Sequence, residues 1–158
     1  MVDGKNDFMK IAVEEAKKGM CCGDGGPFGA VVVRDGKIVA SGHNMVLVNK
    51  DPTCHAEVTA IRNACKVEGN FDLSGCDLYT SCYPCPMCMG ACLWARIGHV
   101  YYAANSQEAE DAGFSDKDFH LFLQQKPNNA ITKLVEYKVT DYLQPFIMWK
   151  ENEQKVPY

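Results

Sequence analysis

The sequence has no long hydrophobic run and no segment typical of protein export. No apolar stretch approaches the roughly 20 residues that a membrane-spanning helix needs. The first residues, MVDGKND, lack the hydrophobic region of a signal peptide. Both features argue against a membrane protein and predict a cytoplasmic one.

An excess of positive charge is also lacking. The 158 residues include 16 lysines and arginines against 20 aspartates and glutamates, a formal net charge of −4. This balance argues against a broad phosphate-binding face, so we expect no nucleic-acid partner. Internal repeats and low-complexity tracts are missing, and a composition of 47% hydrophobic and 23% charged residues is typical of a globular protein. The chain 1–158 is therefore predicted to be a single domain.

The glycine-rich stretch GDGGPFG, residues 23–29, lacks the features of a phosphate-binding loop. No GK[ST] motif follows it, and the next residues, AVVV, are typical of a strand rather than a helix. We expect a tight turn that brings the backbone close to a ligand.

Cysteine, by contrast, is abundant, with nine residues. In a small secreted protein this number would indicate a disulfide framework. Here there is no secretion signal, and the chain is long enough to bury about two-thirds of its unfolded surface. Reduced thiols together with a metal site are the better interpretation.

Strand-like and helix-like patterns alternate along the chain. An Asp-Gly turn at 35–36 predicts a hairpin of strands 31–34 and 37–41. Further strands are expected over 77–81, 99–103 and 132–139. Helices are expected over about 8–20, 54–67, 85–95, 119–125 and 141–153, with a short helix or turn over 106–113 and an irregular loop over 45–52. The alternation predicts a three-layer α/β/α domain with a mixed five-stranded sheet.

Two short stretches carry the chemistry. The first, CHAE, contains His55 and Glu57, and the second, PCPMC, contains Cys85 and Cys88. One imidazole and two thiolates suit Zn²⁺ and leave a fourth tetrahedral position for water. Cys85 and Cys88 share one face in the first turn of a helix, where anions are stabilised. Glu57 is placed to move the proton of that water.

Other thiols have compatible spacing. Cys82 lies three residues before Cys85, and Cys92 lies four residues after Cys88 but one turn deeper, which favours a core position. A closed structural zinc site with Cys82 or Cys54 as the fourth ligand is the competing interpretation. It would leave the glutamate without a role. The remaining histidines, His43, His99 and His120, are expected to be packed or solvated.

At these residues the chain resembles the cytidine-deaminase-like superfamily, whose zinc-dependent nucleobase deaminases share H-x-E followed by P-C-x-x-C. Within it, the chain is similar to the small bacterial-type guanine deaminases over nearly its whole length. The resemblance rests on GGPFGAVVV, DPTCHAEVTAIRNACK, YTSCYPCPMCMGA, YYAA and AGFSD, on Asn44, on Trp94-Ala95-Arg96, and on a chain that ends in tyrosine.

The resemblance implies one Zn²⁺ per subunit, held by His55, Cys85 and Cys88, with Glu57 as the catalytic proton shuttle. It implies hydrolytic deamination of guanine at C2, giving xanthine and ammonia. The backbone N–H group at Ala56 would help to polarise the site.

It also implies how a purine base, the small-molecule partner, is recognised. Asn44 would hydrogen-bond the purine edge, Asp116 would read the N–H side of guanine, and Phe28 would stack on the ring. The other interpretations are a turn former for Asn44, a helix cap for Asp116 and a core residue for Phe28.

A lid is implied at the C-terminus. Tyr158 would close the pocket from the partner subunit of a domain-swapped homodimer, with about residues 141–158 exchanged and Trp94 near the lid. The alternative for Tyr158 is a frayed terminus.

Two positions depart from the family pattern. Cys54 stands where alanine is commoner, and a thiol beside the metal would either confuse the ligand assignment or make the site oxidation-sensitive. Tyr83 stands where an acidic residue often precedes the proline, and it would alter the rim of the pocket and the substrate preference. Other functions are left open on separate grounds. The alternatives are a guanosine deaminase, a tRNA adenosine deaminase, a cytosine deaminase, and a non-catalytic zinc-binding module that would unfold when the metal is chelated.

Overall fold

Four strands form a mixed sheet at the centre of the fold: β1 (Gly29–Arg34), β2 (Lys37–His43), β3 (Cys76–Cys82) and β4 (His99–Ala104). The structure is a computed structural model that describes residues 4–129 and 131–157. The strand order is β2-β1-β3-β4; β1 pairs antiparallel with β2 and β3, and β3 pairs parallel with β4. The predicted hairpin between β1 and β2 is confirmed.

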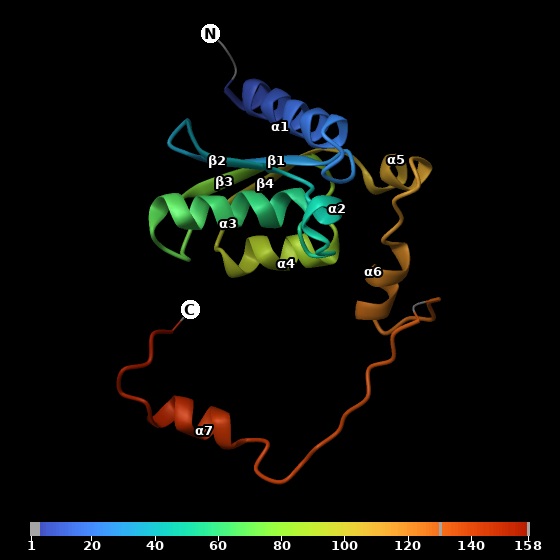
Figure 1. The fold of residues 1–158 in the computed structure, drawn as a ribbon. Coiled ribbons are helices and arrows are strands. Elements are labelled where there is room, and N and C mark those ends of the chain that lie inside the picture. Colours follow the sequence, from blue (N-terminus) through green and yellow to red (C-terminus); the bar gives the residue numbers. More distant parts are fainter. Residues whose placement is uncertain (1–3, 130, 158) are drawn as a thin grey trace.

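Helices cover both faces of this sheet (Figure 1). α1 (Gly4–Cys21) lies on one face, while α3 (Ala56–Glu68) and α4 (Pro86–Trp94) lie on the other. Because side chains alternate along a strand, Val31 and Val33 of β1 pack in the core beneath α1, and Ala30 and Val32 pack in the core beneath α3 and α4. The predicted three-layer α/β/α arrangement is confirmed.

Two glycines let the helices lie close to one end of the sheet. A Cβ added at Gly29 would lie 2.1 Å from the carbonyl oxygen of Ala12 in α1, and one at Gly42 would lie 2.6 Å from the nitrogen of Ala60 in α3. Any larger residue would push these helices away from the end of the sheet where the site residues lie.

After β4 the chain forms two short helices, α5 (Ser106–Asp111) and α6 (Lys117–Leu123), and then leaves the domain. The residues that follow, 126–129 and 131–157, are called the C-terminal arm below; they include α7 (Gln144–Glu151) and extend away from the sheet (Figure 1). Over the described part of the chain, no helix is both long and apolar enough to cross a membrane.

The expected fifth strand over 132–139 is wrong. These residues pair with no other strand in the described chain, and side chains around them are open to solvent, with Ile131 96% and Tyr137 86% exposed. Apolar residues do recur here at alternate positions, and this pattern is typical of a strand. A strand also needs a hydrogen-bonded neighbour, however, and the arm runs away from the sheet instead of along it.

The other helix boundaries shift by a few residues. The helix expected at 54 begins at Ala56, the one expected over 119–125 spans 117–123, and the last helix is shorter than expected. A single-turn helix, α2 (Val46–Asn49), lies in the loop expected to be irregular.

Candidate active site

Three potential metal ligands meet where α3 and α4 begin. His55 is the N-cap of α3, Cys85 is the N-cap of α4, and Cys88 lies in the first turn of α4. His55 Nδ1 lies 3.5 Å from the Sγ atom of each cysteine. Zinc bound at about 2.0 Å to nitrogen and about 2.3 Å to sulfur separates tetrahedral ligand atoms by about 3.5 Å, so the group fits Zn²⁺.

The caps leave these side chains available to a metal. Neither His55 nor Cys85 uses its side chain to cap its helix, and both have extended backbone, with ψ angles of 160° and 167°. The side chains therefore project towards each other from two helix N-termini, whose backbone N–H groups favour the thiolate form.

Without a metal, hydrogen bonds among these three side chains shift the pKa of each one. The pKa of Cys85 is lowered to about 4, first by a hydrogen bond from Cys88 and also by His55. The pKa of Cys88 is raised, first by this same hydrogen bond and then by burial. The hydrogen bond to Cys85 raises the pKa of His55. A thiolate at Cys85 is thus already in place, and Cys88 would release a proton when zinc binds.

The other candidate thiols do not join this group. Among the described residues, His55, Cys85 and Cys88 are the only His, Cys, Asp or Glu side chains that gather closely enough to hold a metal. Cys54 is buried with its Sγ turned to Asp51 Oδ2 at 3.1 Å, and Cys92 is buried in the core. In the part of the chain that the structure describes, the closed site with Cys82 or Cys54 as the fourth ligand is therefore not formed, and the predicted core position of Cys92 is confirmed.

Glu57 lies beside the ligand group on the first turn of α3. It is one of few buried charged residues, and Thr80 Oγ1 of β3 donates a hydrogen bond to its Oε1 over 3.1 Å. Burial raises the pKa of Glu57, against the opposing effect of hydrogen bonds from Cys88 and Thr80. A carboxylate with a raised pKa next to a metal site is well suited to accept and return a proton.

A pocket of about 570 Å³ opens onto this group, with His55, Glu57 and Cys85 in its wall. The rest of the wall is mainly apolar and includes Phe28, Leu47, Tyr83, Phe114 and Phe119. The rings of Phe28 and Phe114 meet edge to face, with centroids 4.9 Å apart. Such a wall favours a flat, largely apolar ligand with polar edges.

Asn44 supplies a polar group to this wall. Its Oδ1 accepts hydrogen bonds from the backbone nitrogens of Gly26 at 3.3 Å and Val46 at 3.1 Å. Asn44 is thus a loop former, as one interpretation predicted, and it also lines the pocket. Because Oδ1 is used by the loops, the amide NH₂ group is left to donate to a ligand.

Asp116 supplies a carboxylate to the same wall. It occupies the N-cap position of α6, but its side chain makes no capping hydrogen bond. Its Oδ2 instead lies 3.0 Å from Nε2 of His120, one turn along the helix. The helix-cap interpretation therefore does not explain this side chain, which lines the pocket.

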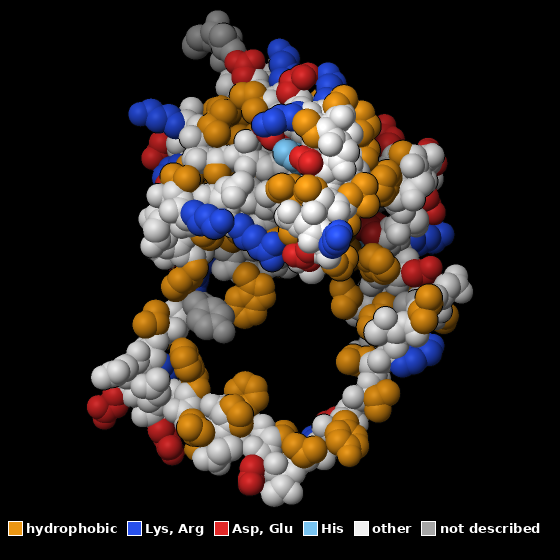
Figure 2. Space-filling model, in the orientation of Figure 1, with side chains coloured by type: hydrophobic (Ala, Val, Ile, Leu, Met, Phe, Trp, Pro, Cys, Tyr) orange, Lys and Arg blue, Asp and Glu red, His pale blue; other side chains and the backbone are white. Residues whose placement is uncertain are grey.

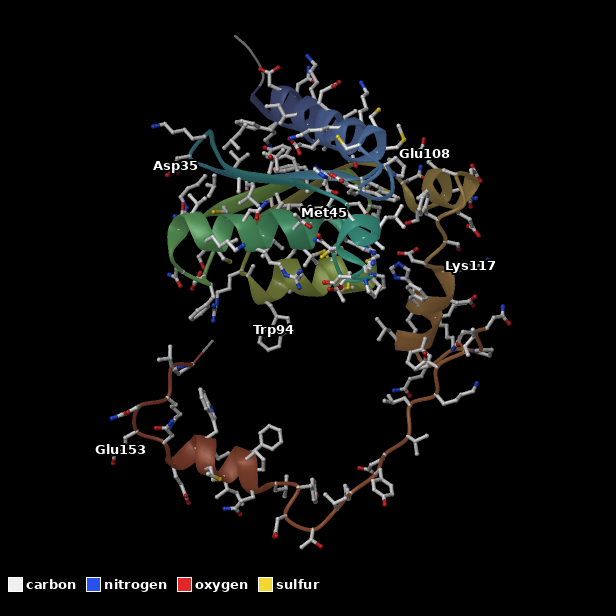
Figure 3. All side chains as sticks on the ribbon, viewed as in Figure 1. Asp35, Met45, Trp94, Glu108, Lys117 and Glu153 are labelled. Carbon is white, nitrogen blue, oxygen red and sulfur yellow. The ribbon has the colours of Figure 1, made fainter. Side chains whose placement is uncertain are left out.

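Two of the predicted substrate-binding residues, Ala56 and Trp94, do not line the pocket, and a third, Tyr158, lies outside the described residues. Ala56 is fully buried in the core beneath α3. Trp94 is 70% exposed at the end of α4, on the side that faces the C-terminal arm (Figure 3). The roles given to these three residues stay predictions.

Thr80 and Phe119 were not predicted as site residues, and Cys82 was considered only as the fourth ligand of a closed zinc site. Thr80 contacts Glu57, and Cys82 and Phe119 line the pocket. Alternation in β3 could have placed Thr80 and Cys82 on one face of the sheet, but nothing local indicates that this face meets Glu57. Burial raises the pKa of Cys82 to about 11, which keeps its thiol neutral.

Comparison with known proteins agrees with this geometry. Residues 3–104 match the family described as the cytidine and deoxycytidylate deaminase zinc-binding region. The chain is 47% identical over 151 residues to guanine deaminase of Bacillus subtilis (strain 168), covering 96% of this chain and 97% of that protein. The X-ray structure of guanine deaminase from Bacillus subtilis superposes with a TM-score of 0.91 at 46% identity, covering 97% of this chain and 98% of that one. A tRNA-specific adenosine deaminase of Aquifex aeolicus is 43% identical over 101 residues, 64% of this chain and 66% of that protein.

Proposed function

Because the chain belongs to the cytidine and deoxycytidylate deaminase zinc-binding family, we propose that it hydrolyses guanine to xanthine and ammonia. The observation that carries this proposal is the buried Glu57 beside the His55, Cys85 and Cys88 group at the wall of an aromatic pocket. The near full-length similarity to a guanine deaminase supports guanine as the substrate.

His55, Cys85 and Cys88 would hold Zn²⁺. Zinc in such a site lowers the pKa of water to about 7 and so supplies a nucleophile at neutral pH. Glu57 accepts the proton of the attacking water and passes it to a ring nitrogen as the new C–O bond forms at C2. It then takes the remaining proton from the new hydroxyl group at C2 and delivers it to the exocyclic amine, so that the C–N bond breaks, the C2 carbonyl forms and ammonia leaves. Water and guanine are consumed, and xanthine and ammonia are formed.

The pocket would hold the purine at its edges and one face. The NH₂ group of Asn44 donates to an acceptor of the purine edge, and the carboxylate of Asp116 accepts from the N–H side of guanine. Phe28, held by Phe114, supports the ring plane. Base recognition by one donor, one acceptor and one aromatic face would orient C2 towards the metal group.

The C-terminal arm would dock on a second copy of the chain, which makes a domain-swapped homodimer. Hydrophobic side chains gather along the arm and on the part of the domain that faces it (Figure 2). Phe146 and Met148 of α7 are exposed, and so are Leu93 and Trp94 of α4. A single copy leaves this apolar area in water, and burial against a second copy would stabilise it. Tyr158, which follows the arm in the sequence, would then reach the partner's pocket as a lid.

Guanosine is the second candidate substrate. A pocket of about 570 Å³ falls in the range of roughly 300–1,000 Å³ that suits drug-sized ligands, and it leaves room beyond a purine base. A Tyr158 lid would fill that room. Deletion of Tyr158 is therefore expected to reduce turnover of guanine more than that of guanosine, and an equal effect on both would contradict the lid.

The test of the proposed function is ammonia release by the zinc-loaded full chain from equal concentrations of guanine, guanosine, cytosine and adenine. Release from guanine alone supports the proposal. A preference for guanosine would keep the zinc chemistry and place a ribose in the pocket. Release from none of them would contradict the proposal and direct attention to tRNA adenosine or to a non-catalytic zinc site.

A further inference from the structure

His43, the last residue of β2, lies between two carboxylates from different segments. Its Nε2 is 2.7 Å from Asp24 Oδ2, and its Nδ1 is 3.3 Å from Glu15 Oε2 of α1. The His43 side chain is only 13% exposed. Its ring also packs against Gly19, where an added Cβ would lie 2.4 Å from the ring. His43 is thus a packed residue, as predicted, but a packed residue with two specific carboxylate partners.

Asp24 is the centre of the loop that joins α1 to β1. Its backbone nitrogen donates to the Gly19 oxygen of α1 over 3.0 Å. Its backbone oxygen accepts from the nitrogens of Leu47 and Val48 in α2, each at 3.0 Å. The residue therefore links α1 with α2, and the contact with His43 adds a side-chain attachment to the end of β2.

The same two segments fix the amide of Asn44, the residue next to His43. The donors to Asn44 Oδ1 are Gly26, two residues after Asp24, and Val46, the first residue of α2. Gly25 lies so close that an added Cβ would be 2.0 Å from Oδ1. The rotation of the Asn44 amide therefore depends on where Asp24 holds the loop and α2.

We propose that His43 is a positioning residue: through Asp24 it holds the loop and α2, so that the Asn44 amide is aimed into the pocket before the ligand arrives. This inference rests on the proposed function in one respect, that Asn44 contacts the purine. A ligand that meets an already fixed donor loses no binding free energy in ordering that donor. The contact between His43 and Asp24 therefore raises the affinity for the ligand. His55, Cys85 and Glu57 are held by α3 and α4, and the chemical step is accordingly independent of the pair.

The test measures kcat and KM for guanine on the zinc-loaded full chain. His43→Ala is expected to raise KM five- to tenfold and to change kcat less than twofold. Asp24→Ala should do the same, and the double variant should be no worse than either single one. His43→Gln, which keeps an N–H donor within reach of Asp24, should recover most of the loss.

Two comparisons separate positioning from mere stabilisation. In an Asn44→Ala background, His43→Ala is expected to raise KM no further, whereas a general loosening of the fold would add to it. His99→Ala is the matched control, because His99 Nδ1 pairs with Asp77 Oδ1 at 2.9 Å far from the pocket. KM in that variant should stay within twofold of the unmodified chain.

Hydrogen exchange gives a readout that does not need a substrate. The amides of Gly26 and Val46 are expected to exchange faster in His43→Ala but not in His99→Ala. An unchanged KM and unchanged exchange in folded His43→Ala would overturn the inference. So would a KM increase that persists undiminished in the Asn44→Ala background. Failure of the unmodified chain to deaminate guanine would instead overturn the proposed function, and the exchange measurement would still decide the role of His43.

Discussion

Thr80 of β3 and Glu57 of α3 meet through a buried hydrogen bond, in which Thr80 Oγ1 donates to Glu57 Oε1 over 3.1 Å. The bond joins the sheet to the helix that carries His55. It fixes one carboxylate oxygen and stabilises the ionised carboxylate, which burial disfavours.

Thr80→Val is expected to shift the acidic limb of the pH–activity profile to higher pH. The Thr80 hydrogen bond lowers the pKa of Glu57, so its loss raises this pKa further. Because the carboxylate must be ionised to accept the proton of water, activity is lost sooner as the pH falls. The loss of activity is expected to be largest on the acidic limb, where Glu57 is protonated in the variant but still ionised in the unmodified chain. Thr80→Ser keeps the hydroxyl and is the control; equal acidic limbs in both variants would contradict the role of the bond.

Glu57→Gln is expected to keep zinc and lose turnover. The substitution preserves the shape of the side chain and leaves all three metal ligands, but the amide cannot accept the proton. The loss in kcat should be about 10²- to 10⁴-fold, the usual contribution of a general acid–base group. Zinc content by elemental analysis and ammonia release are the two measurements. Glu68→Gln, on the same helix but paired with Arg34 far from the pocket, should stay within twofold. Full activity in Glu57→Gln would disprove the mechanism.

Zinc affinity is expected to rise with pH. The raised pKa values of Cys88 and His55 mean that protons occupy this group when no metal is bound. Zinc must displace these protons to bind. Acidification therefore favours the proton-bound form and lowers the affinity of the site for zinc. Calorimetry in buffers of different ionisation enthalpy should show net proton release near pH 7, and chelator competition should succeed more readily at pH 6 than at pH 8. Cys92→Ala, a buried thiol outside the group, is expected to bind zinc with the same pH dependence. Affinity that does not change with pH would argue against Cys88 as a ligand.

The metal group could be predicted from the sequence because its geometry is local. A histidine at one helix start and two cysteines three residues apart at another need only those two helices to meet, and the strand pattern around them is regular. Glu57 was predicted for the same reason, since it lies two residues from His55 on the first turn of α3.

Residues that depend on distant contacts could not be predicted in this way. Thr80 became a site residue only because β3 lies beneath α3, and the importance of Asp24 depends on a histidine 19 residues away. The expected fifth strand failed for a different reason: its local sequence pattern is typical of a strand, but the fold does not use it as one. The alternation over 131–139 is a correct local pattern, but the hydrogen-bonded neighbour that a strand requires is not encoded in the segment itself, and the arm leaves the sheet.

The C-terminal arm gives the final prediction, that the full chain is a dimer in solution and that apolar residues of α7 hold it together. Phe146 is 66% exposed in the single chain, on a helix that makes no extensive contact with any other helix or strand that the structure describes. Phe146→Asp would place a charge in the proposed interface, so it is expected to convert the dimer to a monomer in light scattering coupled to size exclusion. Lys150→Asp puts the same charge on the same exposed helix and should leave the dimer intact.

If the arm also carries the lid, the Phe146→Asp monomer should retain zinc but turn over guanine at least tenfold less well, because the pocket of each copy would lose the partner's Tyr158. A Phe146→Asp chain that remains dimeric would place the interface elsewhere, and a fully active monomer would show that the pocket is complete within one copy.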